Sequence, residues 1–458
     1  MKIANGNLYK LIVSFMVPLF LFSQPYLAEP KAFAMSTEEE RILGQKFVIQ
    51  IRQSFDFVDD DFVDQYINDL GHYLIRPLET KHFPFHFYTV KDNDLNAFAG
   101  PGGHIFIFSG LINVMDEVDE LAAVISHEIA HVSARHLLSR IEKGKKIGIA
   151  TLVGMLVGIL VGGDAGGAIV AGSTAAGMQA QLHYSREDER QADQLGFRYT
   201  DAAGFDPSGL IEALKEIQKG QWLGTDRIPP YLLTHPTGPE RMSNLDIMLS
   251  DYAKKSENRK TEKFRTLYPF FKTIVRAKSV EPREAERVFN EELEKDPDSK
   301  LAHFGLGMVC KERSEYDLAI DHFQKALKGQ PESVPVLRNL GEAFQLKGQE
   351  AKAITVLEKS LKIDDQDRSA LFLLAMSYQN LEEYQKAIRL YERLTSMNLV
   401  KDEVFYNLGL SYGREGEFAH AHYNFGIYYK RLGRREVAKF HFQKAADLSK
   451  NDPALQGR

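Results

Sequence analysis

The stretch Leu121–His131, with the sequence LAAVISHEIAH, determines how the first half of the chain is organised. Asp116 can cap a helix that leads into it, because acidic residues stabilise the positive end of a helix. The uninterrupted apolar run predicts that this helix is buried. His127 and His131 are four residues apart, so their side chains project from one face and can bind a single metal ion. Glu128 lies beside them, where a carboxylate can accept a proton from water.

A zinc ion bound there needs a further protein ligand, which must come from another element. The acidic segment Tyr184–Asp193 is the candidate for this ligand. Its apolar residues give a helix a buried side, and Glu189, Asp193 and Asp188 all lie near that side. Periodicity alone does not choose between these three carboxylates, and a solvated, charged helix is the alternative interpretation.

Composition limits the classes of protein to which the chain can belong. Its 458 residues allow two or three domains, and 44% apolar with 26% charged residues excludes a disordered or an all-membrane chain. A formal net charge of −6 argues against a nucleic-acid partner, which requires a clustered basic excess. Cys310 is the single cysteine, so there is no disulfide framework within the chain and no cysteine-rich metal site.

Residues 1–34 have the features of a secretory signal peptide. Lys2 and Lys10 precede an apolar run from Leu11 to Phe22, and residues 32–34 read Ala-Phe-Ala, a cleavage pattern. The run is too short for a stable membrane-spanning helix, although an uncleaved anchor is the alternative. Export without disulfides predicts a protein of a Gram-negative periplasm.

The second half of the chain repeats a pattern every 34 residues. The small residues of the pattern are Gly307, Gly341, Ala375 and Gly409, and the alanines that follow each of them by twelve residues are Ala319, Ala353, Ala387 and Ala421. The pattern restarts at Gly426, 17 residues after Gly409. It resembles the tetratricopeptide repeat and predicts an all-α solenoid over residues 267–450, preceded by a polar linker at 251–266.

Two motifs resemble those of the gluzincin peptidases that include the CAAX-prenyl endopeptidases and the heat-shock membrane protease. They are H-E-x-x-H at residues 127–131 and E-x-x-A-D at residues 189–193. The resemblance implies an α+β zincin-like metallopeptidase domain over residues 36–250, mostly helical with a small sheet. It also implies one Zn²⁺ per chain held by His127, His131 and Glu189, with Asp193 orienting a ligand.

Two glycines in the same region precede an apolar strand. Gly102 and Gly103 end a Gly/Pro turn, and Ile105 and Ile107 lie in the strand that follows. Family members have a similar segment before the strand that lines the substrate. The resemblance therefore predicts that this is an edge strand that pairs with an extended peptide, whereas composition alone also permits a core hairpin.

A second loop bears on the expected metal site. His235 precedes a proline, and a histidine in that position is more often structural than a ligand. Periplasmic relatives carry a similar H-P loop, whose histidine can fill the fourth zinc position and exclude water. The resemblance makes His235 an inhibitory ligand and gives Arg241 a role in stabilising the loop or the oxyanion. Residues 237–239 read Thr-Gly-Pro, so the loop departs from the commoner H-P-L-P form of the family.

An uncharged segment lies between the two ligand motifs. Residues 147–163 are rich in glycine and aliphatic residues and stand at the lower length limit for a membrane span. A lid over the cleft, a hairpin that contacts a membrane surface and a true span are three alternatives.

The family resemblance also implies a function. It implies a periplasmic zinc metalloendopeptidase that degrades misfolded or stalled outer-membrane proteins and assists their assembly as a chaperone does. Its repeat domain would contact the outer-membrane beta-barrel assembly machinery. The alternative is a binding or chaperone module with a largely latent peptidase site. A peptidoglycan or lipid hydrolase requires a metal constellation of another spacing.

Overall fold

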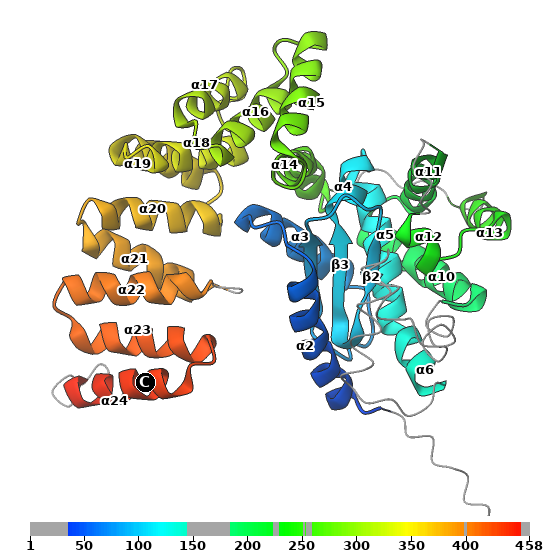
Figure 1. The fold of residues 1–458 in the computed structure, drawn as a ribbon, viewed down its shortest axis with the longest axis horizontal. Helices are drawn as coiled ribbons and strands as arrows, with labels where there is room; N and C mark the ends of the chain where they lie inside the picture. Colours follow the sequence, from blue (N-terminus) through cyan, green and yellow to red (C-terminus); the bar gives the residue numbers. More distant parts are fainter. Residues whose placement is uncertain are drawn as a thin grey trace, which may run out of the picture.

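The computed structural model describes residues 35–143, 184–222, 229–250, 252, 259–397 and 401–449. It shows a mostly helical domain with a small sheet, followed by a helical solenoid (Figure 1). The predicted fold class is therefore confirmed. The predicted signal peptide at 1–34 and the apolar segment at 147–163 lie outside the described residues.

The first domain contains three strands and the helices around them. Its elements are α2 (Thr37–Ser54), α3 (Asp61–Leu74), β1 (His86–Val90), β2 (Ala97–Ala99), the 3-10 helix η1 (Pro101–Gly103), β3 (His104–Phe108), α4 (Ser109–Val114), α5 (Val118–Ser133), α6 (His136–Lys143), α10 (Arg186–Ala203), α11 (Gly209–Trp222), α12 (Pro230–Thr234) and α13 (Pro239–Ser250).

The sheet has the strand order β1-β3-β2, with β3 parallel to β1 and antiparallel to β2. Because successive side chains of a strand alternate between the two faces, β3 contributes to two separate cores. Phe106 packs with Phe47 of α2 on one face, and Ile105 and Ile107 join the core around α5 on the other. The sheet is thus covered by helices on both faces.

The prediction that β3 is a substrate-binding edge strand is wrong. β3 lies in the middle of the sheet and pairs with a strand on each side, so its main chain is not free for a peptide. Ile105 and Ile107 are fully buried core residues. Gly102 and Gly103 have φ angles of 72° and 87°, which favour glycine, and they form the turn between β2 and β3. Sheet order is set by pairing between distant residues, which composition does not reveal.

Helix α5 is the central element of the first domain. It begins one residue later than predicted, because Glu117 and not Asp116 is its N-cap. The Glu120 carboxylate accepts hydrogen bonds from the backbone N–H groups of both residues, at 3.2 Å from Asp116 and 3.0 Å from Glu117. Every residue from Glu120 to Val132 is buried, in agreement with the predicted buried helix.

The remaining helices continue from this domain into the solenoid. They are α14 (Glu262–Ser279), α15 (Pro282–Lys295), α16 (Lys300–Glu312), α17 (Tyr316–Ala326), α18 (Val334–Leu346), α19 (Glu350–Ile363), α20 (Arg368–Asn380), α21 (Tyr384–Thr395), α22 (Asp402–Arg414), α23 (Phe418–Arg431) and α24 (Arg435–Leu448).

Helix α14 belongs to both halves of the molecule. It starts at Glu262, inside the polar segment 251–266 for which the sequence predicts a linker. The ring of Phe271 stacks on Tyr66 of α3 at 4.4 Å between centroids, and the Tyr268 hydroxyl donates to the carbonyl oxygen of Met115 at 3.0 Å. One continuous hydrophobic core therefore runs from the first domain through α14 into the repeats.

Small residues in the solenoid allow its helix pairs to pack closely. A Cβ atom on Gly307 would lie 2.5 Å from the ring of Phe323, and one on Gly341 would lie 2.6 Å from Leu357. The solenoid runs back beside α2 and α3 (Figure 1), where Lys401 forms an ion pair with Asp61. Among the described helices, none combines the length and apolar character needed to span a membrane.

Candidate metal centre

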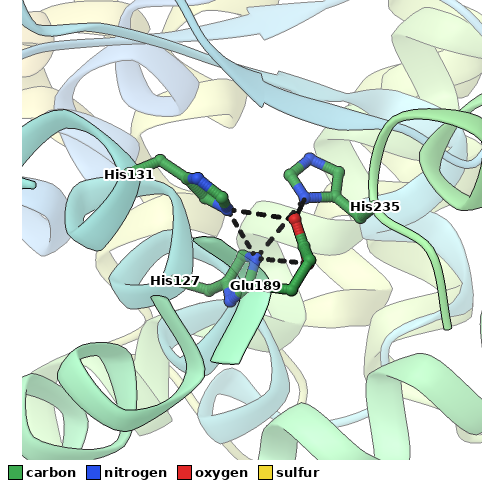
Figure 2. A group of neighbouring side chains, drawn as sticks. All are labelled: His127, His131, Glu189 and His235. Atoms are coloured by element: carbon green, nitrogen blue, oxygen red, sulfur yellow. Dashed lines mark hydrogen bonds and ion pairs between the residues drawn. The ribbon is translucent and has the colours of Figure 1, made fainter. Parts of the chain in front are cut away.

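Four side chains from three elements meet in the interior of the first domain. His127 and His131 come from α5, Glu189 from the first turns of α10, and His235 from the residue that ends α12 (Figure 2). All four are buried, with at most 2% of their surface exposed. Capping by Ser185 starts α10 and places Glu189 on the side that packs against α5.

One ligand atom from each residue points to a common centre. Nε2 of His131 lies 3.0 Å from Nε2 of His127, and Oε1 of Glu189 lies 3.5 Å from Nε2 of His131. Nδ1 of His235 lies 3.0 Å from Oε1 of Glu189 and 3.5 Å from Nε2 of His127. Bonds of about 2.0–2.1 Å to a tetrahedral zinc ion separate its ligand atoms by about 3.3 Å. The donor set therefore fits a zinc ion.

Asp193 determines which nitrogen of His127 is free for a metal. Its Oδ1 lies 3.0 Å from Nδ1 of His127. A carboxylate this close favours a proton on Nδ1, which leaves the lone pair on Nε2, the nitrogen that faces the centre. Burial lowers the pKa of His127, but contacts with Asp193 and Glu189 outweigh it and raise that pKa. The position of Asp193 agrees with the orienting role that the family resemblance implied.

A second hydrogen-bonded chain orients His131. Nε2 of His136 lies 2.9 Å from Oε1 of Gln191, an oxygen that can only accept, so His136 donates from Nε2. The lone pair of His136 is then on Nδ1, which lies 3.0 Å from Nδ1 of His131. His131 consequently donates from Nδ1 and presents the lone pair of Nε2 to the centre.

Arg241 joins the two carboxylates of α10. Its guanidinium donates to both oxygens of Asp193, at 2.9 and 2.8 Å, and lies 2.7 Å from Oε2 of Glu189. Burial would lower the pKa of Arg241, but the two carboxylates raise it, so the guanidinium stays charged. The same charge, together with His235, keeps the pKa of Glu189 low although burial raises it. Arg241 thus fixes Glu189 as a carboxylate in the ligand position.

Glu128 stands beside the four ligands without taking part in the set. Both of its carboxylate oxygens are buried and have no hydrogen-bond partner among the described residues. Oε1 lies 3.5 Å from Nε2 of His235. Burial raises the pKa of Glu128, and His235 and His127 oppose this rise. A buried carboxylate of raised pKa next to a metal centre is suited to accept and return a proton.

Comparison with known proteins identifies the first domain. Residues 62–249 match the family model of peptidase family M48. They form an M48 domain. Four tetratricopeptide-repeat models match residues 277–334, 311–375, 370–399 and 419–452. The family resemblance and the repeats predicted from the sequence are therefore confirmed.

Curated relatives share the M48 domain. The beta-barrel assembly-enhancing protease of Yersinia pestis is 32% identical over 223 residues, which are 48% of this chain and 46% of the relative. The protein of that name from Escherichia coli strain K12 is 31% identical over 223 residues, with the same coverage. The chain thus spans about half the length of the curated relatives it matches. The crystal structure of MamA is 26% identical over 32% of this chain and 95% of its own, with a TM-score of 0.25.

Two tyrosines that no sequence motif indicates enclose the M48 centre, which is the group of His127, His131, Glu189 and His235. The ring of Tyr184 lies 3.8 Å from the ring of His131, and the ring of Tyr231 stacks on His235 at 4.4 Å. Tyr184 comes immediately before α10 and Tyr231 lies one turn before His235. Their closeness in sequence to Glu189 and His235 is the only sequence feature that could have indicated this role. A tyrosine near a helix end is too common to identify a residue of a metal site.

Close packing of α10 on α5 holds the candidate ligands of the M48 domain together. Gly196 lies so close to α5 that a Cβ atom there would be 3.0 Å from Cα of His127. This contact sets how near Glu189 and Asp193 come to the two imidazoles.

Three residues that the sequence offers as site candidates lie away from the four candidate ligands. Asp188 forms an ion pair with Arg140 and accepts the backbone N–H of Ser185, so it is not near the centre as a ligand. Gly102 and Gly103 contact α2 and the segment at Pro84, away from the four ligands.

Proposed function

We propose that the chain is a zinc metalloendopeptidase with one catalytic zinc ion. The observation that supports it is the buried group of His127, His131, Glu189 and His235, with Glu128 beside it. When bound there, zinc supplies Lewis-acid chemistry that polarises a peptide carbonyl and lowers the pKa of a water molecule. Two imidazoles and a carboxylate are a donor set that suits zinc.

The chain's own residues supply the proton transfers. Glu128 accepts the proton of the attacking water on its carboxylate and returns it to the leaving amine. Asp193 and His136 keep the lone pairs of the two imidazoles directed at the centre, and Arg241 keeps Glu189 in place. These roles support peptide hydrolysis, because the reaction needs one proton acceptor next to the metal ligands and Glu128 lies there.

His235 acts as the inhibitory ligand in this proposal. Its Nδ1 occupies the fourth corner of the ligand set, where a catalytic site needs room for water. The His235 loop must therefore move before hydrolysis. The loop follows α12, a short helix of five residues. A hydrogen bond from the N–H of Tyr231 to the carbonyl oxygen of Leu95, at 3.3 Å, joins α12 to the segment before β2.

β2 replaces β3 as the proposed substrate-binding strand. The carbonyl oxygen of Asn96 accepts the N–H of Phe108, and the N–H of Gly100 donates to the carbonyl oxygen of His104. The even-numbered residues of the β2 segment therefore direct their main-chain polar groups toward β3. The N–H and C=O groups of Ala97 and Ala99 therefore point outward from the edge of the sheet. An extended peptide paired with them would lie beside α5, which β2 contacts.

The proposed substrates are misfolded or stalled outer-membrane proteins in the periplasm, after export directed by residues 1–34. The solenoid would contact the outer-membrane beta-barrel assembly machinery, since stacked repeats offer an extended concave surface. Support comes from the M48 domain, the repeats, and relatives named beta-barrel assembly-enhancing proteases. A chaperone module with a latent peptidase site is the second candidate, favoured by the closed fourth position at His235.

Substitution of the proton acceptor distinguishes the two candidates. Glu128→Gln keeps the shape of the side chain and leaves the four ligands intact. We expect the variant to bind zinc as the wild type does and to lose about 10²–10⁴-fold in the rate of cleavage of an unfolded outer-membrane protein. If it cleaves at the wild-type rate, the assignment of Glu128 is wrong. If it is inactive yet fully restores assembly in cells that lack the protein, the chaperone function is favoured.

A further inference from the structure

Two pairs of histidines lie in the solenoid, far along the chain from the M48 ligands. Nδ1 of His303 on α16 is 3.2 Å from Nδ1 of His322 on α17. Nδ1 of His422 on α23 is 2.9 Å from Nδ1 of His441 on α24. In each pair the two rings come from the two helices of one repeat, and all four side chains are partly exposed.

The two pairs occupy equivalent positions of the repeat. His303 and His422 each come four residues before the small residue of their repeat, Gly307 or Gly426. His322 and His441 each come three residues after the corresponding alanine. The repeats between them carry other residues at these two positions, namely Leu337 with Val356, Leu371 with Leu390, and Phe405 with Asn424. Packing of the repeat therefore does not require histidine there.

We propose that each histidine pair binds one divalent transition-metal ion such as Zn²⁺. The separations of 3.2 and 2.9 Å between the Nδ1 atoms are close to the spacing of about 3.3 Å between neighbouring ligands of a tetrahedral ion. Imidazole suits zinc, copper and nickel, and partial exposure leaves the other positions of the ion open to water.

The surroundings of both pairs allow the rings to act as neutral ligands. Burial lowers the pKa of all four histidines; Lys325 adds to this at His303, and Lys444 at His422. Without a metal, one ring donates its Nδ1–H to the other. To bind an ion, the donor ring moves that proton to Nε2, so that both Nδ1 lone pairs face the ion and the charge of the pair is unchanged.

An ion at each pair would link the two helices of a repeat. α16 and α17 form the first clear repeat predicted from the sequence, and α23 and α24 form the repeat after the register break. The links would thus stand near the two ends of the solenoid. They are independent of the M48 centre, because they share no residue with it.

The test is the number of zinc ions that the full chain binds. Equilibrium dialysis of the full chain against Zn²⁺ alone at pH 7.5 should give two ions more than the M48 centre holds. His303→Leu with His322→Leu should remove one of these ions, and His422→Leu with His441→Leu should remove the other. Leucine is chosen because Leu371 and Leu390 already pack at the equivalent positions.

Controls separate loss of a ligand from loss of structure. His82→Leu replaces an exposed histidine outside both pairs and should change no stoichiometry. His322→Gln and His441→Gln retain a polar side chain but remove one imidazole each, and each should weaken zinc binding at its own pair. These variants replace the leucine variants if the latter fold poorly. The proposal is overturned if the chain binds no zinc beyond the M48 centre, or if the extra ions persist in both double variants.

Discussion

Nδ1 of His136 lies 3.0 Å from Nδ1 of His131, and this contact decides which nitrogen of His131 faces the centre. His136 can accept there only because its other nitrogen donates to Oε1 of Gln191 at 2.9 Å. His131, the proposed metal ligand on α5, is therefore oriented by an uncharged residue of α10 through an intervening ring. Outer hydrogen bonds of this kind tune metal affinity as well as geometry.

Gln191→Leu should weaken zinc binding without removing a ligand. The substitution takes away the acceptor that fixes the proton of His136, so His131 loses its preference for the metal-binding tautomer. We expect affinity to fall by about 10–100-fold, measured by competition with a chelator. Gln194→Leu, at an exposed position on the same helix, is the matched control and should bind zinc as the wild type does. Equal affinity in both variants would exclude the relay.

Gly196→Ala should separate the ligands of α10 from those of α5. A methyl group at Gly196 would meet Cα of His127 at 3.0 Å, so α10 must shift and carry Glu189 with it. We expect a loss of about 1–3 kcal/mol in the free energy of unfolding and a fall in zinc affinity. Gly413→Ala is the control, because its methyl would meet Ala421 at an ordinary 3.8 Å and should stabilise α22 by about 0.5–1 kcal/mol.

His235→Ala should open the fourth position of the centre. Zinc affinity should fall because one donor is lost, while the rate of cleavage of an unfolded protein should rise because water gains access. Both quantities are measured on the same zinc-loaded preparation. The double variant with Glu128→Gln should be inactive, which assigns the added activity to this site. A His235→Ala variant that cleaves more slowly than the wild type would rule out an inhibitory role.

His104 should make the fold sensitive to acid. Burial, aided by the neighbouring His86, lowers the pKa of His104 to about 4. The unfolded chain, with a pKa near 6.5, then binds more protons than the folded chain between these values, so stability falls as the pH drops from about 6.5 to 4. His104→Gln should reduce this loss by about 3 kcal/mol, measured by urea unfolding at pH 7 and pH 4. An unchanged difference would show that His104 is not buried as a neutral ring.

Local patterns were sufficient to predict much of the centre. His127 and His131 lie four residues apart on one helix, so their convergence follows from helical geometry alone. The choice of Glu189 over Asp188 could not follow from periodicity. It depends on contacts between distant segments. Arg140, 48 positions earlier, pairs with Asp188. Gly196 packs against His127 so that Glu189 faces the imidazoles.

Contacts between distant segments explain what the sequence did not reveal. The placement of β3 between β1 and β2 depends on pairings such as His86 with His104, and no local pattern distinguishes a central from an edge strand when both are apolar. The charged first turn of α14 favours a linker when it is judged by composition alone. The aromatic residues of this helix, Phe271 among them, contact α3 about two hundred residues earlier in the chain.

Diffraction data collected on both sides of the zinc absorption edge, from crystals of the zinc-loaded chain, test the central claim most directly. We expect an anomalous peak within bonding distance of Nε2 of His127, Nε2 of His131 and Oε1 of Glu189. If no ion lies between these three atoms, or if the Glu189 carboxylate turns away from the two imidazoles, the metallopeptidase assignment is contradicted.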